Sequence, residues 1–188
     1  MFTLSHPPVQ EFSGGAKGDT GLIAASVKKL ASNNAHERLA ARTALERAGA
    51  AAVQPLIKAL NNDDEIVRWE AAKALGEIGD RSAAEALVQA LTDKSFDVRW
   101  VAAESLIALG ETGVPALLEA LAHLHASVML YRQAHHILHS LSNGPMPIEV
   151  RNVLKALEKS AANIHVPVAA YTALEFLRSK KGEAPIKG

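Results

Sequence analysis

Apolar residues recur along this chain with the period of an α-helix. Starting at Val67, they fall at positions i, i+4, i+7, i+8 and i+11, which places them on one face of a helix that reaches Ile78. The shorter run around Leu56 and Leu60 has the same spacing. Alanine, leucine, glutamate, lysine and arginine fill both runs, and all five favour helices. No segment resembles a strand, so the pattern predicts an all-α protein.

The helical pattern repeats at an interval of about thirty residues. The segment VRWEAAKALGEIG at 67–79 returns as VRWVAAESLIALG at 98–110, a displacement of 31 residues, and ERLAARTALERAG at 37–49 precedes both in register. A second apolar run follows each copy, and these runs end at Leu60, Leu91 and Leu121. A unit of this size cannot bury its apolar face alone, so the repeats predict helix pairs stacked in series.

The array is less regular at its two ends. The run LIAASVKKL at 22–30 stands alone before the first complete unit, where we expect it to cap the stack. A looser fourth unit covers 130–157, and a fifth begins at 166–177 without a second run.

Glycine, proline and short polar residues mark the helix ends. Gly49, Gly79 and Gly110 stand where the first helix of each pair must stop, because glycine closes a helix in the left-handed conformation without a Cβ clash. Pro55 and Pro115 are expected in the opening turn of the second helix, where a missing N–H costs nothing. Side-chain oxygens for the turns and caps before the next first helix come from Asn62, Asp63, Asp64, Asp93, Ser95 and Asp97.

The segments VRWEAAKALG and VRWVAAESL resemble HEAT repeats, of the short kind first associated with phycobilisome lyases. The resemblance covers residues 20–178 and implies one domain, a right-handed α-solenoid of stacked antiparallel helix pairs. It places the first helices on the convex side and the second helices on the concave side. It also implies a protein-binding scaffold, since this family acts only occasionally as an enzyme. Residues 1–19 and 179–188 are expected to form a flexible leader and a flexible tail.

Composition excludes several functional classes. The 188-residue chain has no cysteine, so it has no disulfide framework, thiolate zinc site or cysteine nucleophile. Its formal net charge is zero, whereas phosphate binding needs a surface of one sign, so we expect no nucleic-acid partner. No apolar run approaches the ~20 residues of a bilayer span, and the start lacks the pattern of a secretory signal. We therefore expect a cytoplasmic protein with no membrane partner and no cofactor.

Two surfaces are candidates for binding a protein or peptide. The predicted concave face carries the outward residues of the second helices, which are Gln54, Lys58, Glu85, Gln89, Glu119, Arg151 and Lys155. The predicted convex row carries Trp69, Trp100 and Arg132, and Trp and Arg are enriched in binding hot spots. The alternative for the two tryptophans, which share one repeat position, is packing between units. An apolar end of the stack, near Tyr171 and Phe176, could also pair with a second copy of the chain.

Three arginines share a position in the first turn of the first helices. Arg38, Arg68 and Arg99 stand in register beside the aspartates of the turns. We expect each guanidinium group to fork onto the acidic loop of an adjacent unit and tie the repeats together.

Five of the eight histidines fall between residues 123 and 139. His135 and His139 have the i, i+4 spacing at which two imidazoles reach one metal ion, with zinc or nickel favoured, and His123 or His125 could supply a third ligand. His136 replaces the glutamate of an HExxH motif, so a general base is missing. The alternative function is thus a metal-dependent or phycobilin-lyase-like enzyme, or enzyme subunit, using this fourth repeat. Without a third ligand, the histidines form a patch that gains charge below about pH 6.5.

Overall fold

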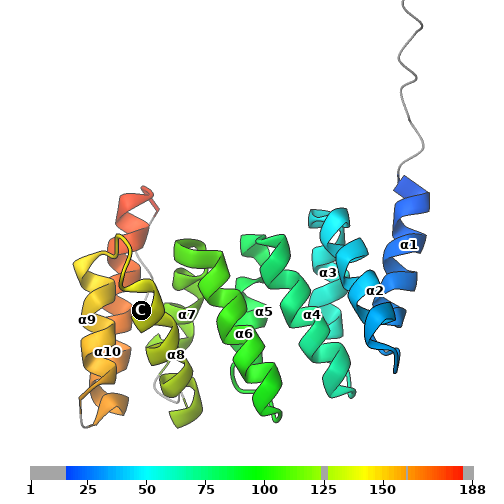
Figure 1. The fold of residues 1–188 in the computed structure, drawn as a ribbon. Coiled ribbons are helices and arrows are strands. Elements are labelled where there is room, and N and C mark those ends of the chain that lie inside the picture. The colour runs from blue at the N-terminus through cyan, green and yellow to red at the C-terminus, as the bar shows by residue number, and fades with distance from the viewer. Residues whose placement is uncertain (1–15, 124–126, 160, 184–188) are drawn as a thin grey trace, which may run out of the picture.

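The computed structural model describes residues 16–123, 127–159 and 161–183. These residues form helices stacked side by side in an elongated array, with no strand among them (Figure 1). The prediction of an all-α solenoid is confirmed. The elements are α1 (Ala16–Lys29), α2 (Ala35–Ala48), α3 (Ala50–Ala59), α4 (Glu65–Ile78), the 3-10 helix η1 (Arg81–Ala83), α5 (Ala84–Ala90), α6 (Phe96–Leu109), the 3-10 helix η2 (Gly110–Thr112), α7 (Val114–Ala122), α8 (Val128–Leu141), α9 (Ile148–Leu157) and α10 (Ala162–Lys180).

The helices form two rows. The first helices α2, α4, α6 and α8 pack on one another in sequence and stand in front in Figure 1. The second helices α3, α5 and α7 lie behind them, and each first helix packs against the second helix of a neighbouring unit. The helix α1 packs on α2 and α3, as expected for a cap. A continuous core of leucine, alanine and valine fills the space between the rows and holds the stack together.

The predicted helix ends agree with the structure at most positions. Gly49, Gly79 and Gly110 all have positive φ, at +56°, +72° and +59°. The side chains of Asp64 and Ser95 cap α4 and α6, because they accept hydrogen bonds from the backbone N–H groups of Ile66 and Val98. Both results follow from local turn chemistry, which the repeat pattern contains.

One proline does not lie where we expected it. Pro115 falls in the first turn of α7, as predicted. Pro55, by contrast, lies inside α3, because Gly49 joins α2 directly to a helix that starts at Ala50. The helix α3 therefore begins earlier in the sequence than its apolar pattern indicated.

The first helices α4 and α6 approach each other closely at Gly76. The hydroxyl of Ser105 is buried and donates a hydrogen bond of 2.9 Å to the carbonyl oxygen of Ala72. A Cβ atom added to Gly76 would lie 2.5 Å from Ser105 Oγ and 2.9 Å from Ser105 Cα. This seam therefore depends on the absence of a side chain at residue 76.

The last helix departs from the repeat pattern. We expected residues 166–177 to open a fifth unit and extend the row of first helices. Instead α10 packs against both α7 and α9, so it lies in the row of second helices and separates these two (Figure 1). Its buried face, which includes Val166, Ala170, Ala173 and Leu174, covers the side of α7 that the next repeat would otherwise occupy.

The helical boundaries extend slightly beyond the expected domain of residues 20–178. The helix α1 begins at Ala16 and α10 ends at Lys180. Most of the expected leader and tail, residues 1–15 and 184–188, lies outside the described part. Among the described residues, no single helix is long and apolar enough to cross a bilayer; one pair bent by 109°, residues 96–112 with 114–122, meets these criteria jointly.

Candidate functional site

An aromatic patch lies on the row of first helices, where Phe96, Trp100 and His136 meet. Phe96 and Trp100, both on α6, are 63% and 48% exposed, and their ring centroids are 6.5 Å apart. The ring of His136, on α8, stacks on Trp100 at a centroid distance of 5.2 Å. His136 Nε2 lies 3.0 Å from Glu104 Oε1, and the Arg99 guanidinium carbon lies 5.6 Å from the centroid of the Phe96 ring. These contacts orient the rings although the patch is open to solvent.

The other candidate tryptophan has a different environment. Trp69, at the same repeat position on α4, is half-buried and packs against the core. The guanidinium carbon of Arg42 lies 6.0 Å from the centroid of its ring. Arg132, at the corresponding position on α8, is exposed. The row of Trp69, Trp100 and Arg132 therefore contains one half-buried tryptophan and one exposed tryptophan.

The candidate residues of the second helices do not form one continuous row. The residues on α3, α5 and α7 are exposed and follow one another along the array; they are Gln54, Lys58, Glu85, Gln89 and Glu119. Arg151 and Lys155 belong to α9, which α10 separates from α7. Glu119 already accepts a hydrogen bond of 3.2 Å from Arg178 on α10. The proposed seven-residue face is thus divided at α10.

The histidines of α8 are split between two environments. His135 and His139 stack at a ring-centroid distance of 5.9 Å, and His135 Nε2 lies 3.7 Å from Glu158 Oε1. His136 belongs to the aromatic patch. No group of three His, Cys, Asp or Glu side chains that could hold a metal ion occurs in the described ranges, which include His123. His125, the other candidate for a third ligand, lies outside them.

The arginine fork is formed in full at Arg68. Its Nε and Nη2 atoms donate to the two carboxylate oxygens of Asp93 at 2.8 and 3.0 Å, and Nη1 donates to the carbonyl oxygens of Asn62 and Asp63. Burial alone would raise the pKa of Asp93, but the hydrogen bonds from Arg68 and from the Ser95 N–H outweigh it and lower that pKa. The fork ties two units together, as predicted.

The two equivalent arginines bind differently. Arg38 donates to the carbonyl oxygen of Ser32 and to Glu70 on the neighbouring first helix, instead of an acidic loop. Arg99 donates to the carbonyl oxygens of Asp93 and Lys94 in its own unit, and its buried Nε has no partner among the described residues. The prediction that each arginine binds an adjacent acidic loop is therefore wrong for these two.

A carboxylate network joins α2 to α4. Arg42 lies 2.5 Å from Glu70 and 3.1 Å from Glu77, and 3.5 Å from Glu46 on its own helix. A hydrogen bond to Glu77, together with burial and the charge of Glu77, raises the pKa of Glu46 to about 7. Between about pH 4.5 and 7 this seam therefore favours retention of a proton that an isolated glutamate would release.

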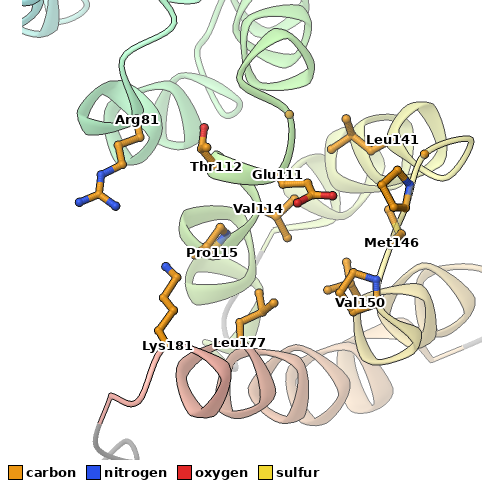
Figure 2. A pocket seen from close by; sticks show the side chains of 14 residues that line it. Arg81, Glu111, Thr112, Val114, Pro115, Leu141, Met146, Val150, Leu177 and Lys181 are labelled. Carbon is orange, nitrogen blue, oxygen red and sulfur yellow. The ribbon is translucent and has the colours of Figure 1, made fainter.

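A pocket of about 480 Å³ opens beside the C-terminal end of α10 (Figure 2). We call it the edge pocket. Its apolar lining includes Val114, Pro115, Leu141, Met146, Val150 and Leu177. Three charged residues, Arg81, Glu111 and Lys181, also line it. Figure 2 shows Arg81 and Lys181 on one side of the opening and Leu141, Met146 and Val150 on the other.

Sequence reasoning missed the edge pocket because its walls come from five separate segments. They are η1, the start of α7 with η2, the connection from α8 to α9, the start of α9, and the end of α10. Only the placement of α10 against α7 and α9 brings these segments together. No local signal in the sequence indicates which of these segments lie next to one another.

Comparisons with known proteins identify the repeats. The family model for HEAT repeats matches residues 23–107 and 53–134, which together span more than half of the chain. A search of curated proteins found no match. Among solved structures, the chain is similar to a crystal structure of an engineered protein from a structural genomics consortium, at 23% identity and a TM-score of 0.40, covering 84% of this chain and 79% of that one. On the strength of the repeat matches, the chain belongs to the HEAT-repeat family.

Proposed function

We propose that the chain is a protein-binding scaffold whose main contact surface is the aromatic patch of Phe96, Trp100 and His136. HEAT repeats are commonly protein-interaction scaffolds, which supports the general function. The observation that carries the specific surface is the exposed Trp100 ring, held between neighbouring rings on α6 and α8.

The patch has the physical properties of an interface hot spot. Trp100 and Phe96 offer large apolar area, and burying such rings accounts for much of the energy of many interfaces. Because ring contacts already restrain Trp100, a partner loses less conformational freedom in fixing it. Glu104 contacts His136 and Arg99 contacts Phe96, so charges of both signs lie beside the rings, which suits a polar rim around an apolar centre.

Site-specific crosslinking tests this surface. A photoreactive phenylalanine analogue at residue 96 should capture a discrete set of proteins in the native cell. Trp100→Ala should remove that set, whereas the double variant Lys58→Glu, Gln89→Lys, which changes the second helices, should leave it intact. Thermal melts of the purified variants establish that all remain folded.

The opposite pattern would relocate the interface. Partners lost with the double variant and kept with Trp100→Ala would place it on the row of Gln54, Lys58, Glu85, Gln89 and Glu119. A captured set that neither change alters would refute both surfaces. No observation on the described residues favours the alternative of a lyase or metal-dependent enzyme.

A further inference from the structure

We propose that the edge pocket binds a short peptide segment of a partner protein, in which an apolar side chain stands next to a carboxylate. The inference rests on the proposed function as a protein-binding scaffold, but it concerns a different surface from the aromatic patch. It names the chemistry of one partner segment.

The interior of the pocket is built to receive an apolar side chain. Pro115, Leu141 and Leu177 are only half-buried, although other side chains of their helices are fully buried. Met146, in the connection between α8 and α9, is also half-buried. A volume of about 480 Å³ falls within the range of clefts that bind ligands. Filling it removes this apolar surface from water, which is favourable.

The charged lining favours an anionic ligand on one side. Arg81 and Lys181 are both exposed, and neither makes an ion pair with another described side chain. Because they come from η1 and from the residue after α10, two separate parts of the chain place positive charge at one side of the opening (Figure 2). A carboxylate bound there gains charge-assisted hydrogen bonds from both.

Glu111 decides between a peptide and a simple apolar acid. Its carboxylate lines the same pocket without an ion pair in the described residues. An alkyl carboxylate offers Glu111 no hydrogen-bond donor, and its negative charge would repel the carboxylate of Glu111. A peptide supplies backbone N–H donors for Glu111, a carboxylate for Arg81 and Lys181, and a side chain for the apolar floor.

Selection of a random dodecapeptide library, displayed on phage, against the purified and immobilised full chain tests the proposal. We expect enrichment of peptides that combine large apolar residues with Asp or Glu. Synthetic versions of the enriched peptides should bind at least about tenfold more weakly to the double variant Arg81→Glu, Lys181→Glu. Replacing their acidic residues by Asn and Gln should weaken binding to the native protein to a similar extent, and added salt should weaken the native complex.

A second variant fills the pocket without changing charge. Gly144 lines the pocket, its φ is not positive, and an added Cβ meets only the Leu141 carbonyl oxygen, at 3.5 Å. Gly144→Trp should therefore fold and reduce peptide binding at least about tenfold. The matched controls are Gly21→Trp, at an open site on α1, and Lys58→Glu on α3; both should bind as the native chain does.

The remaining outcomes separate the alternatives. Enriched peptides that bind only with a free C-terminus assign the carboxylate to the chain end, and those that bind equally when amidated assign it to Asp or Glu. Failure to enrich any motif, enrichment of peptides without acidic residues, or binding unaffected by both pocket variants would overturn the proposal. So would calorimetric binding of decanoate in the absence of any peptide binding. Since none of these variants touches Trp100, failure here leaves the crosslinking result to decide the proposed function.

Discussion

Gly76→Ala should destabilise the protein, although alanine is the better helix former. Gly76 lies in α4, where it faces Ser105 on α6. The added Cβ would lie 2.5 Å from Ser105 Oγ, 2.7 Å from Ser105 Cβ and 2.9 Å from Ser105 Cα. The hydroxyl group could rotate away, but the Cα atom is part of the backbone and moves only with α6.

Two opposing effects set the magnitude. Replacing glycine by alanine inside a helix gains about 1 kcal/mol from conformational propensity. Against this, overpacking a well-packed seam costs about 1–3 kcal/mol. Moving the Ser105 hydroxyl breaks its buried hydrogen bond to Ala72, which costs about 1–3 kcal/mol if the groups stay unsatisfied. Together these terms give an expected loss of about 1–5 kcal/mol in the free energy of unfolding, at the upper end if the hydrogen bond is lost as well as the packing.

Urea denaturation followed by circular dichroism measures this loss directly. The matched control is Gly21→Ala in α1, where nothing lies within 4 Å of the added Cβ; its stability should rise by up to about 1 kcal/mol. Adding Ser105→Gly to Gly76→Ala removes two of the three close atoms and should recover part of the loss relative to the sum of the single variants. A Gly76→Ala protein as stable as the Gly21→Ala control would refute the close approach of α4 and α6.

Three further outcomes follow from the contacts described above. Asp93→Ala should lower the free energy of unfolding, measured by urea denaturation, by about 3 kcal/mol, because it leaves the buried Arg68 charge without its carboxylate. A double-mutant cycle with Arg68→Ala should give a coupling energy above about 1 kcal/mol, and additive losses would contradict the fork. The pKa of Glu46 is raised from 4.5 to about 7, so the folded chain retains a proton that the unfolded chain releases, and stability from this group should fall as pH rises from about 4.5 to 7. In melts across this pH range, Glu46→Gln should reduce the pH-dependent loss of unfolding free energy by about 1 kcal/mol, since partial exposure of Glu46 weakens the effect. Identical pH profiles for the variant and the native chain would contradict this prediction. Trp69→Ala should lower the melting temperature more than Trp100→Ala does, because only Trp69 packs against the core, and equal shifts would argue against this difference.

Local sequence signals predicted much of the fold. Gly49, Gly79 and Gly110 end helices in positive-φ conformations because the chain must reverse there, and the repeat displays that requirement three times. The Arg68 fork could be predicted because its acidic partner lies in the next loop. The same reasoning was wrong for Arg99, because the segment 122–127 that follows its unit in the sequence contains no acidic residue. Among the described residues, the buried Nε of Arg99 has no partner.

The position of α10 could not be predicted from periodicity. A run of Val166, Ala170, Ala173 and Leu174 shows which face of a helix is buried, but not which neighbour covers it. If α10 had extended the row of first helices, it would have buried the same face. The edge pocket and the division of the second-helix row both depend on the choice that the structure makes, so neither was accessible from the sequence.

The two tryptophans show how equal repeat positions acquire different roles. Arg42 covers Trp69, but its register equivalent in the next unit is Ala72, whose methyl group is too short to reach Trp100. On the other side, His136 stacks on Trp100, whereas its register equivalent is Glu104, which has no ring to stack on Trp69. Neither difference changes the helical pattern of the repeat, so the array keeps its shape while one ring becomes exposed. Variation at positions around a constant residue is thus enough to expose an aromatic ring at one unit of an otherwise regular array, and this is why we propose the partner contact at Trp100 and not along the whole row.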